Sequence, residues 1–233
     1  RSLDRLSPAA DFLAILGRDP MLTHHEGPTA MGVDVGTDFH CVILDRPYEN
    51  SVRLVRACSA TSKKQKDFTP LHEAIMKYGV RSLVIDMQFA QAQGRKFIIS
   101  EMAATGCEIY GNFYQDHYRG VVNWDSKERI VREDRTEVCD NTHDIVITPG
   151  AFIMPRQSEI VMEYIKQMCS LVKAYTEDPI TGNREARYRK RGPDHYRHAT
   201  NYALLASKRV GVYTPKKVQE RRVDRWAQEE EQK

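Results

Sequence analysis

The order of apolar segments between residues 31 and 114 constrains the fold more than any other feature of the sequence. Residues 31–35, 39–45 and 51–58 carry apolar side chains in the patterns of β-strands, and short turns separate them. We expect three consecutive antiparallel strands, because a short turn joins antiparallel neighbours whereas parallel strands need a long crossover.

Helices and strands then alternate. Residues 68–79 and 92–105 are predicted helices, and each is followed by an apolar strand, at 82–87 and 107–114 respectively. A strand that is reached through a helical crossover is most often parallel to its predecessor. The sequence therefore predicts an α/β fold with a mixed central sheet, antiparallel strands first and parallel strands after them, flanked by helices.

The chain beyond residue 120 gives a weaker pattern. It predicts, in order, a strand at 128–133, a short helix at 136–141, a strand at 144–150, a helix from Ser158 to Tyr175, a basic loop at 177–192 and a last helix from Pro193 to Arg209. Ser158 suits a helix N-cap, and proline is tolerated at the first position of a helix.

Composition excludes several classes of protein. No apolar run approaches the ~20 residues of a transmembrane helix, so we expect no membrane-spanning protein. The first ten residues lack the apolar core of a signal peptide. Five widely spaced cysteines without a C-x-x-C motif argue against a disulfide scaffold or a zinc ribbon and favour a reducing compartment. Because the chain begins with Arg1 rather than Met, we expect a fragment of a longer protein.

Positive charge is concentrated late in the chain. The formal net charge of the whole chain is only +3. Residues 181–222 contain twelve Lys or Arg and three Asp or Glu, and the difference, 12 − 3, is +9. Such a block predicts a surface that binds phosphates, and a solvated loop is the plain alternative.

Three aspartates occupy positions that are typical of a functional site. Asp34 ends the first strand, Asp86 ends the strand at 82–87, and Asp194 lies in the first turn of the last helix. If the first and fourth strands are parallel neighbours, Asp34 and Asp86 project from the sheet edge where open α/β sheets place their ligands. Taken singly, each also has an ordinary explanation, as a turn residue, a strand-end cap or a helix N-terminal acid.

Three carboxylates in one cleft would need a cation. Hard oxygen ligands suit Mg²⁺ or Mn²⁺. A cluster of this kind can hold two ions about 4 Å apart, one to activate a water and one to stabilise the leaving oxygen of a phosphoryl displacement. The sequence therefore predicts a two-metal centre at Asp34, Asp86 and Asp194.

The same residues carry a resemblance to a known family. GVDVG at 32–36, VID at 84–86 and GPDHYRHATNYAL at 192–204 resemble the C-terminal nuclease domain of bacteriophage terminase large subunits. The resemblance extends from about residue 31 to residue 209. It implies a ribonuclease H-like fold and a metal-dependent endonuclease that cuts concatemeric double-stranded viral DNA during genome packaging. The family's metal-binding acids carry over onto Asp34, Asp86 and Asp194.

The resemblance also implies an organisation and a set of partners. Residues 1–30 would be a leader or linker from a missing upstream ATPase domain, 31–212 the nuclease domain, and 213–233 a charged tail. The portal and the small terminase subunit would be partners of the full-length protein, in the cytoplasm of the host cell. No G-x-x-x-x-G-K-[ST] motif is present, so we expect this chain not to hydrolyse ATP.

Several histidines lie close to these acids in the sequence. Relatives often carry a second acid one helical turn after the helix aspartate, where this chain has His198. His198 shares a helix face with Asp194 and is a candidate metal contact or hydrogen-bond partner, with a surface or core histidine as the equal alternative. His195 is a weaker candidate, and Asp38 and His40 follow the first strand closely enough to approach the metals.

The basic residues beside Asp194 form the predicted DNA surface. They are expected to contact phosphates without reading sequence, with Arg95 and Lys96 on the same rim. The predicted set is Arg187, Arg189, Lys190, Arg191, Arg95 and Lys96.

Other interpretations of the sequence stay open. Residues 32–45 also resemble the phosphate-binding hairpin of actin-like and sugar-kinase ATPases, although no duplicated lobe or later glycine-rich adenosine motif is evident. A resolvase or transposase of the same fold is a third possibility. A DNA-binding module whose acids hold no metal is a fourth.

Overall fold

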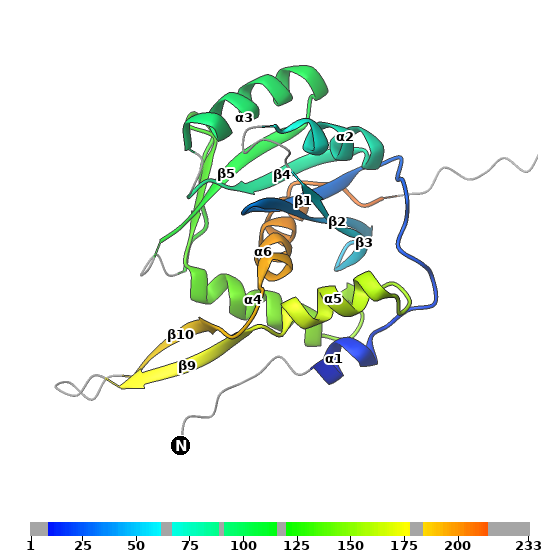
Figure 1. Ribbon diagram of the computed structural model, residues 1–233, viewed down its shortest axis with the longest axis vertical. Helices are drawn as coiled ribbons and strands as arrows, with labels where there is room; N and C mark the ends of the chain where they lie inside the picture. The colour runs from blue at the N-terminus through cyan, green and yellow to red at the C-terminus, as the bar shows by residue number, and fades with distance from the viewer. Residues whose placement is uncertain (1–8, 62–66, 89–90, 116–119, 178–183, 214–233) are drawn as a thin grey trace, which may run out of the picture.

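A mixed eight-stranded sheet forms the centre of the molecule. The computed structural model describes residues 9–61, 67–88, 91–115, 120–177 and 184–213. Within these residues the strands of the main sheet follow the order β6-β7-β5-β4-β1-β2-β3-β8 (Figure 1). Their bounds are β1 Thr29–Val35, β2 Asp38–Tyr48, β3 Ser51–Thr61, β4 Val80–Asp86, β5 Glu108–Tyr114, β6 Asn123–Asp125, β7 Ile130–Glu133 and β8 Phe152–Ile153.

The pairing of these strands confirms the predicted mixed sheet. β1, β2 and β3 are consecutive antiparallel neighbours. β4 pairs with β1 in parallel, β5 pairs with β4 in parallel, and β7 pairs with β5 in parallel. β1 therefore lies at the junction between the antiparallel and the parallel parts of the sheet.

Helices cover both faces of the sheet. α2 (Thr69–Tyr78) and α3 (Gln91–Thr105) pack on one face, as Figure 1 shows. On the other face α6 (His195–Ser207) lies between the sheet and the outer helices α1 (Ala9–Ala14), α4 (Arg135–Ile147) and α5 (Glu159–Met168). None of the helices in the described part of the chain combines the length and apolar character that a membrane span requires.

α6 is the helix on which the second face is built. Every residue from Tyr196 to Ser207 is buried. At Gly32 in β1 the helix backbone comes so close that a Cβ would lie 2.0 Å from the carbonyl oxygen of Ala199. The absence of a side chain at Gly32 therefore sets how closely α6 packs on the sheet.

Two segments differ from the predictions at 144–150 and 158–175. The strand predicted at 144–150 is wrong, because α4 continues to Ile147 and Val146 extends the buried stripe that Val138 and Thr142 begin. The helix that starts after the Ser158 cap ends at Met168 rather than Tyr175. Beyond it the chain forms a strand, β9 (Leu171–Glu177), in which β-branched and aromatic residues favour extended backbone.

The basic loop predicted at 177–192 is also wrong over most of its described residues. β10 (Arg184–Lys190) pairs antiparallel with β9, and the two strands form a hairpin that projects from the body of the molecule (Figure 1). Hydrogen bonds across the strands satisfy the backbone of this polar segment. The hairpin leads directly into α6, so Lys190 at its base lies beside Asp194.

The described part of the predicted leader packs on the domain. Phe12 of α1 belongs to the core cluster between α5, α6 and the sheet. His25 Nε2 lies 3.0 Å from Oδ2 of the fully buried Asp45, which also pairs with Arg53. Residues 1–8 and the tail beyond residue 213 lie outside the described residues.

Candidate active site

Asp34 and Asp86 lie at adjacent strand ends. β1 and β4 pair in parallel with Val33 opposite Ile85, so the next residue of each strand is one of these two aspartates. Both are buried, with exposed fractions of 8% and 6%. Parallel neighbours that end together place their last side chains at one edge of a sheet.

Asp194 reaches the same place from α6. It is the N-cap residue of the helix rather than a first-turn residue as predicted, and its side chain makes no capping hydrogen bond. Instead, Lys190 Nζ lies 2.5 Å from Oδ1, and His198 Nε2 lies 3.3 Å from Oδ2. Asp194 is 4% exposed, so these two partners supply most of its polar contacts.

One pocket collects all three aspartates. Its volume is about 490 Å³. His195, His198 and Lys190 contribute to its walls. The complete lining is Asp34, Asp86, Gln88, Tyr114, Arg135, Lys190, Asp194, His195, His198 and Tyr202.

The three carboxyl groups differ in their electrostatics. Burial, helped by the negative charge of Asp34 and opposed by a backbone hydrogen bond from Gln88, raises the pKa of Asp86 to about 6. Burial also acts to raise the pKa of Asp194, but the hydrogen bonds from His198 and Lys190 outweigh it and hold that pKa well below its usual range. Asp86 therefore keeps its proton to a higher pH than an ordinary aspartate does, whereas Asp194 loses its proton at a lower pH.

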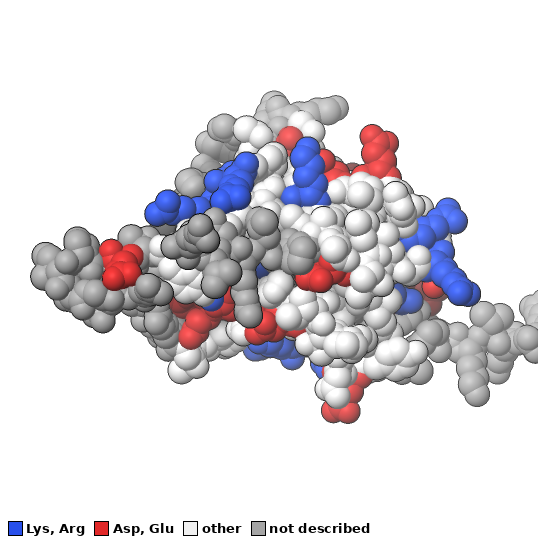
Figure 2. Space-filling view, turned by 90° about the horizontal axis from the view of Figure 1, so that it is seen from below, with Lys and Arg blue, Asp and Glu red and all other residues white. Residues whose placement is uncertain are grey.

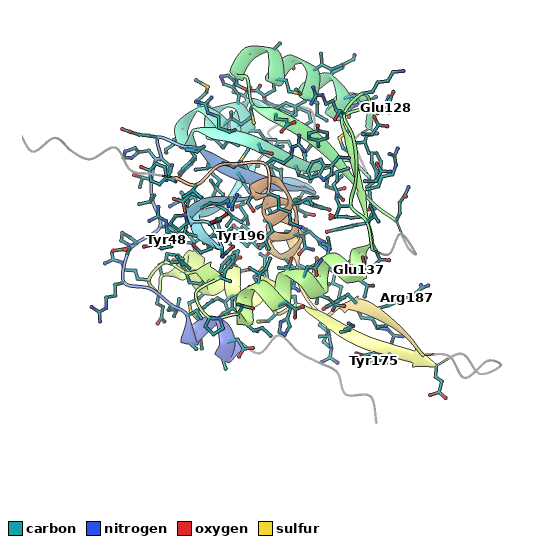
Figure 3. The ribbon with its side chains drawn as sticks, turned by 180° about the vertical axis from the view of Figure 1, so that it is seen from behind. Tyr48, Glu128, Glu137, Tyr175, Arg187 and Tyr196 are labelled. Atoms are coloured by element: carbon teal, nitrogen blue, oxygen red, sulfur yellow. The ribbon has the colours of Figure 1, made fainter. Side chains whose placement is uncertain are left out.

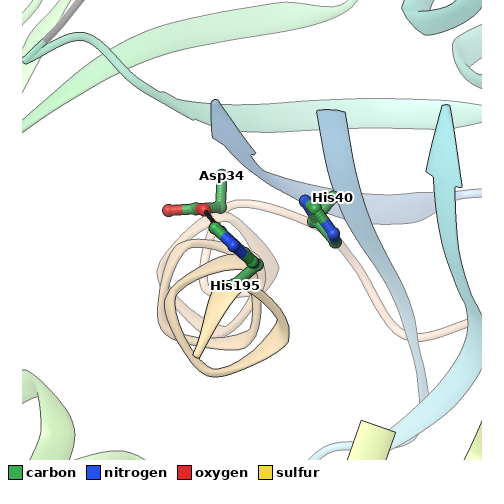
Figure 4. A group of neighbouring side chains, drawn as sticks. All are labelled: Asp34, His40 and His195. Atoms are coloured by element: carbon green, nitrogen blue, oxygen red, sulfur yellow. Dashed lines mark hydrogen bonds and ion pairs between the residues drawn. The ribbon is translucent and has the colours of Figure 1, made fainter. Parts of the chain in front are cut away.

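Asp34 belongs to a compact group with two histidines (Figure 4). His195 Nδ1 lies 2.8 Å from Asp34 Oδ2, and this contact raises the pKa of His195. The ring of His195 stacks on that of His40 with centroids 4.3 Å apart, and His40 is the cross-strand partner of Asp34. Potential ligand atoms of Asp34, His40 and His195 all lie within 4.8 Å of one another, which among the described residues makes them the group best placed to share a cation.

The opposite wall of the pocket was not predicted. Tyr114 Oη lies 3.1 Å from His198 Nδ1 and accepts a hydrogen bond from Asn201 Nδ2. Arg135 Nη2 lies 3.3 Å from His198 Nε2. Tyr114 ends β5 and Arg135 follows β7, so the rule that parallel strands end at one edge was the signal that could have found them.

The predicted basic residues divide into two groups. Lys190 lines the pocket, and Arg187, Arg189 and Arg191 are exposed on or beside β10, where Figure 3 shows Arg187 on the hairpin. Arg95 instead pairs with Glu128 at 3.4 Å, and Lys96 lines a different pocket beside Phe97. Viewed from below, basic and acidic side chains are interspersed with uncharged surface (Figure 2).

Comparison with solved structures identifies proteins of the same architecture. No family model and no curated protein sequence matches this chain. The large terminase nuclease from the thermophilic phage G20c, solved with bound magnesium, superposes with a TM-score of 0.56 at 14% identity, over 88% of this chain and 98% of that one. The chain has the fold of a large terminase nuclease.

Two further structures agree on the terminase nuclease fold. The nuclease domain of the large terminase subunit of bacterial virus Sf6, a variant solved with manganese, gives a TM-score of 0.53 at 8% identity, over 77% of this chain and 88% of that one. The HK97 bacteriophage large terminase superposes with a TM-score of 0.51 at 11% identity, over 87% of this chain and 44% of that one. This chain thus spans less than half of the HK97 protein. The predicted α/β fold with a mixed central sheet is thus one that this chain shares with terminase nuclease domains.

Proposed function

We propose that this chain is a metal-dependent nuclease that hydrolyses phosphodiester bonds of double-stranded DNA. The observation that carries the proposal is the convergence of Asp34, Asp86 and Asp194, which are far apart in the sequence, on one pocket of a terminase nuclease fold. In the full-length protein the domain would cut concatemeric viral DNA during packaging. An upstream ATPase domain, the portal and the small terminase subunit would be its partners in the cytoplasm of the host cell.

The residues of the pocket fit divalent metal ions. Asp34, Asp86 and Asp194 offer the carboxylate oxygens that Mg²⁺ and Mn²⁺ prefer, and His198 and the pair of His40 and His195 offer nitrogen atoms nearby. The raised pKa of Asp86 supports this fit, because burial beside another carboxylate is a cost that a cation removes. Two bound ions would supply the charge that activates a water and stabilises the leaving oxygen.

The protein's own side chains would position the substrate. Lys190 lies at the pocket wall and can pair with a phosphate once Asp194 is engaged elsewhere. Arg187 and Arg189 of β10 and Arg191 directly after it are exposed, and they would hold a duplex by its backbone. Asn201 donates a hydrogen bond to Tyr114, Tyr114 contacts the ring of His198, and His198 in turn contacts Asp194.

The test is a metal-dependent cleavage assay. We expect the purified chain to convert supercoiled plasmid to nicked and linear forms with Mn²⁺, and EDTA to stop the reaction. Asp34→Asn, Asp86→Asn and Asp194→Asn should each reduce cleavage by at least about 100-fold, because each removes a charged metal ligand. Circular dichroism of each variant checks that the fold is retained.

Matched variants make the result specific. Asp144→Asn changes an aspartate of α4 that is not part of the pocket and should cut at the rate of the wild type. Normal cleavage by all three pocket variants would refute the metal assignment. ATP binding measured by calorimetry would instead favour the actin-like or sugar-kinase interpretation.

A further inference from the structure

Two cysteines face each other across the β2–β3 hairpin. Cys41 of β2 is the direct cross-strand partner of Cys58 of β3. Opposed residues in antiparallel strands have Cβ atoms about 4.5–5.5 Å apart, close to the 3.5–4.5 Å of a disulfide. Cys41 belongs to the apolar cluster on the α2 and α3 face and Cys58 packs against it, so the two side chains share one face of the sheet and little rearrangement separates the dithiol from a disulfide.

The environment gives the two thiols different roles. Cys41 is buried, whereas Cys58 is half-buried and therefore within reach of a small solute. The hydrogen bond with Cys41 and the positive charge of Arg56, opposed by burial, lower the pKa of Cys58 to about 7. Cys58 is the nucleophile of the pair because the thiolate is the reactive form.

The other cysteines lack this arrangement. Cys107 and Cys139 are buried, and burial raises the pKa of each. Cys169 is half-buried like Cys58, but burial raises its pKa as well. Cys169 therefore provides a natural comparison of similar exposure without a cross-strand thiol.

We propose that Cys41 and Cys58 form a peroxide-oxidisable dithiol that closes to a cross-strand disulfide. The Cys58 thiolate attacks hydrogen peroxide, the O–O bond breaks, and hydroxide leaves as Cys58 becomes a sulfenic acid. The Cys41 sulfur then attacks the Cys58 sulfur and loses its proton, the S–O bond breaks, and water leaves. Two thiols and one peroxide give one disulfide and two waters, with two electrons passing from sulfur to oxygen.

The site is a modification site separate from the pocket of the aspartates. Cys41 and Cys58 belong to the core cluster on the α2 and α3 face of the sheet, whereas the aspartates lie on the α6 side. Cys41 nevertheless directly follows His40, which stacks on His195. Closing the disulfide would tie β3 to the strand that carries His40.

The experiment is peptide mapping after peroxide treatment of the reduced, full chain. Free thiols are blocked with N-ethylmaleimide, and the chain is digested with trypsin. We expect the tryptic peptide of residues 57–63 to be joined to the peptide that contains Cys41, with a loss of two hydrogens, and the free thiols to fall from five to three. Dithiothreitol should restore all five.

Variants assign the chemistry. Cys169→Ser should still form the disulfide, whereas Cys41→Ser should leave Cys58 as a sulfenic acid that dimedone labels. Five free thiols in the wild type after peroxide, or a disulfide that maps to other cysteines, would overturn the proposal. Mapping of the wild type decides the question even where a variant fails to fold, and no arm depends on nuclease activity.

Discussion

At the scale of single residues, basic side chains of the protein contact the proposed metal ligands. Lys190 and His198 contact Asp194, and His195 contacts Asp34. Each contact stabilises a carboxylate that would otherwise be buried with an uncompensated charge. A metal ion that binds these aspartates must therefore compete with side chains already in place.

Removing Lys190 should strengthen metal binding. Lys190 is about half exposed, so its pair with Asp194 is worth no more than about 1 kcal/mol and the expected gain in Mn²⁺ affinity is about two- to fivefold. Isothermal titration of Lys190→Gln with Mn²⁺ measures the change. Lys173→Gln, which breaks a lysine–aspartate pair with Asp140 outside the pocket, should leave the affinity unchanged. Weaker binding by Lys190→Gln would show that Lys190 helps to assemble the site.

The buried acid Glu133, outside the pocket of the aspartates, makes the stability of the fold depend on pH. Glu133 is 1% exposed, and burial raises its pKa from an ordinary 4.5 to about 8, against a hydrogen bond from Asn112. Between pH 4.5 and about 8 the folded state therefore keeps a proton on Glu133 that the unfolded state has already lost. The free energy of unfolding should fall as pH rises through this window, by up to about 1.4 kcal/mol per pH unit.

Glu133→Gln should flatten this dependence. The amide cannot ionise, so urea unfolding between pH 6 and 8 should show a shallower loss of stability than in the wild type. Glu73→Gln, at an exposed position of α2, should retain the slope of the wild type. If Glu133→Gln and the wild type lose stability equally over this range, Glu133 ionises with an ordinary pKa.

At the scale of elements, the strength of the local signal decided what the sequence could predict. β1, β2, β3 and the helices predicted at 68–79 and 92–105 were predicted well, because the apolar periodicity of each segment and the glycine at residue 79 mark them clearly. The strand predicted at 144–150 was wrong because the β-branched residues there favour a strand, whereas burial of Val146 against the core favours the continued helix. The register of β9 with β10 depends on pairing that local patterns do not contain.

The close packing of α6 on β1 predicts how a substitution at Gly32 affects stability. A Cβ at Gly32 would lie 2.2 Å from the backbone nitrogen of Ala203, so Gly32→Ala must push the helix away from the sheet. We expect a loss of about 1–3 kcal/mol or more in the free energy of unfolding, measured by urea denaturation. Gly211→Ala meets nothing within 4 Å and should be nearly neutral. Equal stabilities of the two variants would contradict the close packing.

The candidate site was only partly visible in the sequence. Asp34, Asp86 and Asp194 could be singled out because each ends a strand or starts a helix. Tyr114 and Arg135, which contact His198, were missed, because the strand-end rule finds them only when it is also applied to β5 and β7. The assignment of all these residues to metal binding and catalysis stays a prediction.

At the scale of the whole molecule, the hairpin carries the basic residues away from the sheet. Arg187 and Arg189 lie on β10 of this hairpin, and Arg191 directly follows the strand. Substituting all three by glutamine should weaken duplex binding and lower the slope of log K against log salt by about 1 to 3, since each lost phosphate contact removes about 0.9. Fluorescence anisotropy with a labelled duplex between 50 and 200 mM salt measures both.

A second triple variant separates contact from net charge. Arg18, Lys77 and Arg81 are exposed away from the hairpin, and their replacement by glutamine removes the same charge. We expect the salt slope of this variant to match that of the wild type. If the two triple variants change duplex affinity and the salt slope equally, DNA binding depends only on the overall charge of the protein.

The placement of α6 also has a consequence for biosynthesis. The ribosome makes Asp34 and Asp86 early, but Asp194 emerges only after almost the whole domain, and its helix must then dock against strands already present. Until that docking occurs, the nascent chain holds two of the three proposed ligands. On the proposed function, an incomplete chain would lack the third ligand, so cleavage would begin only with the completed fold.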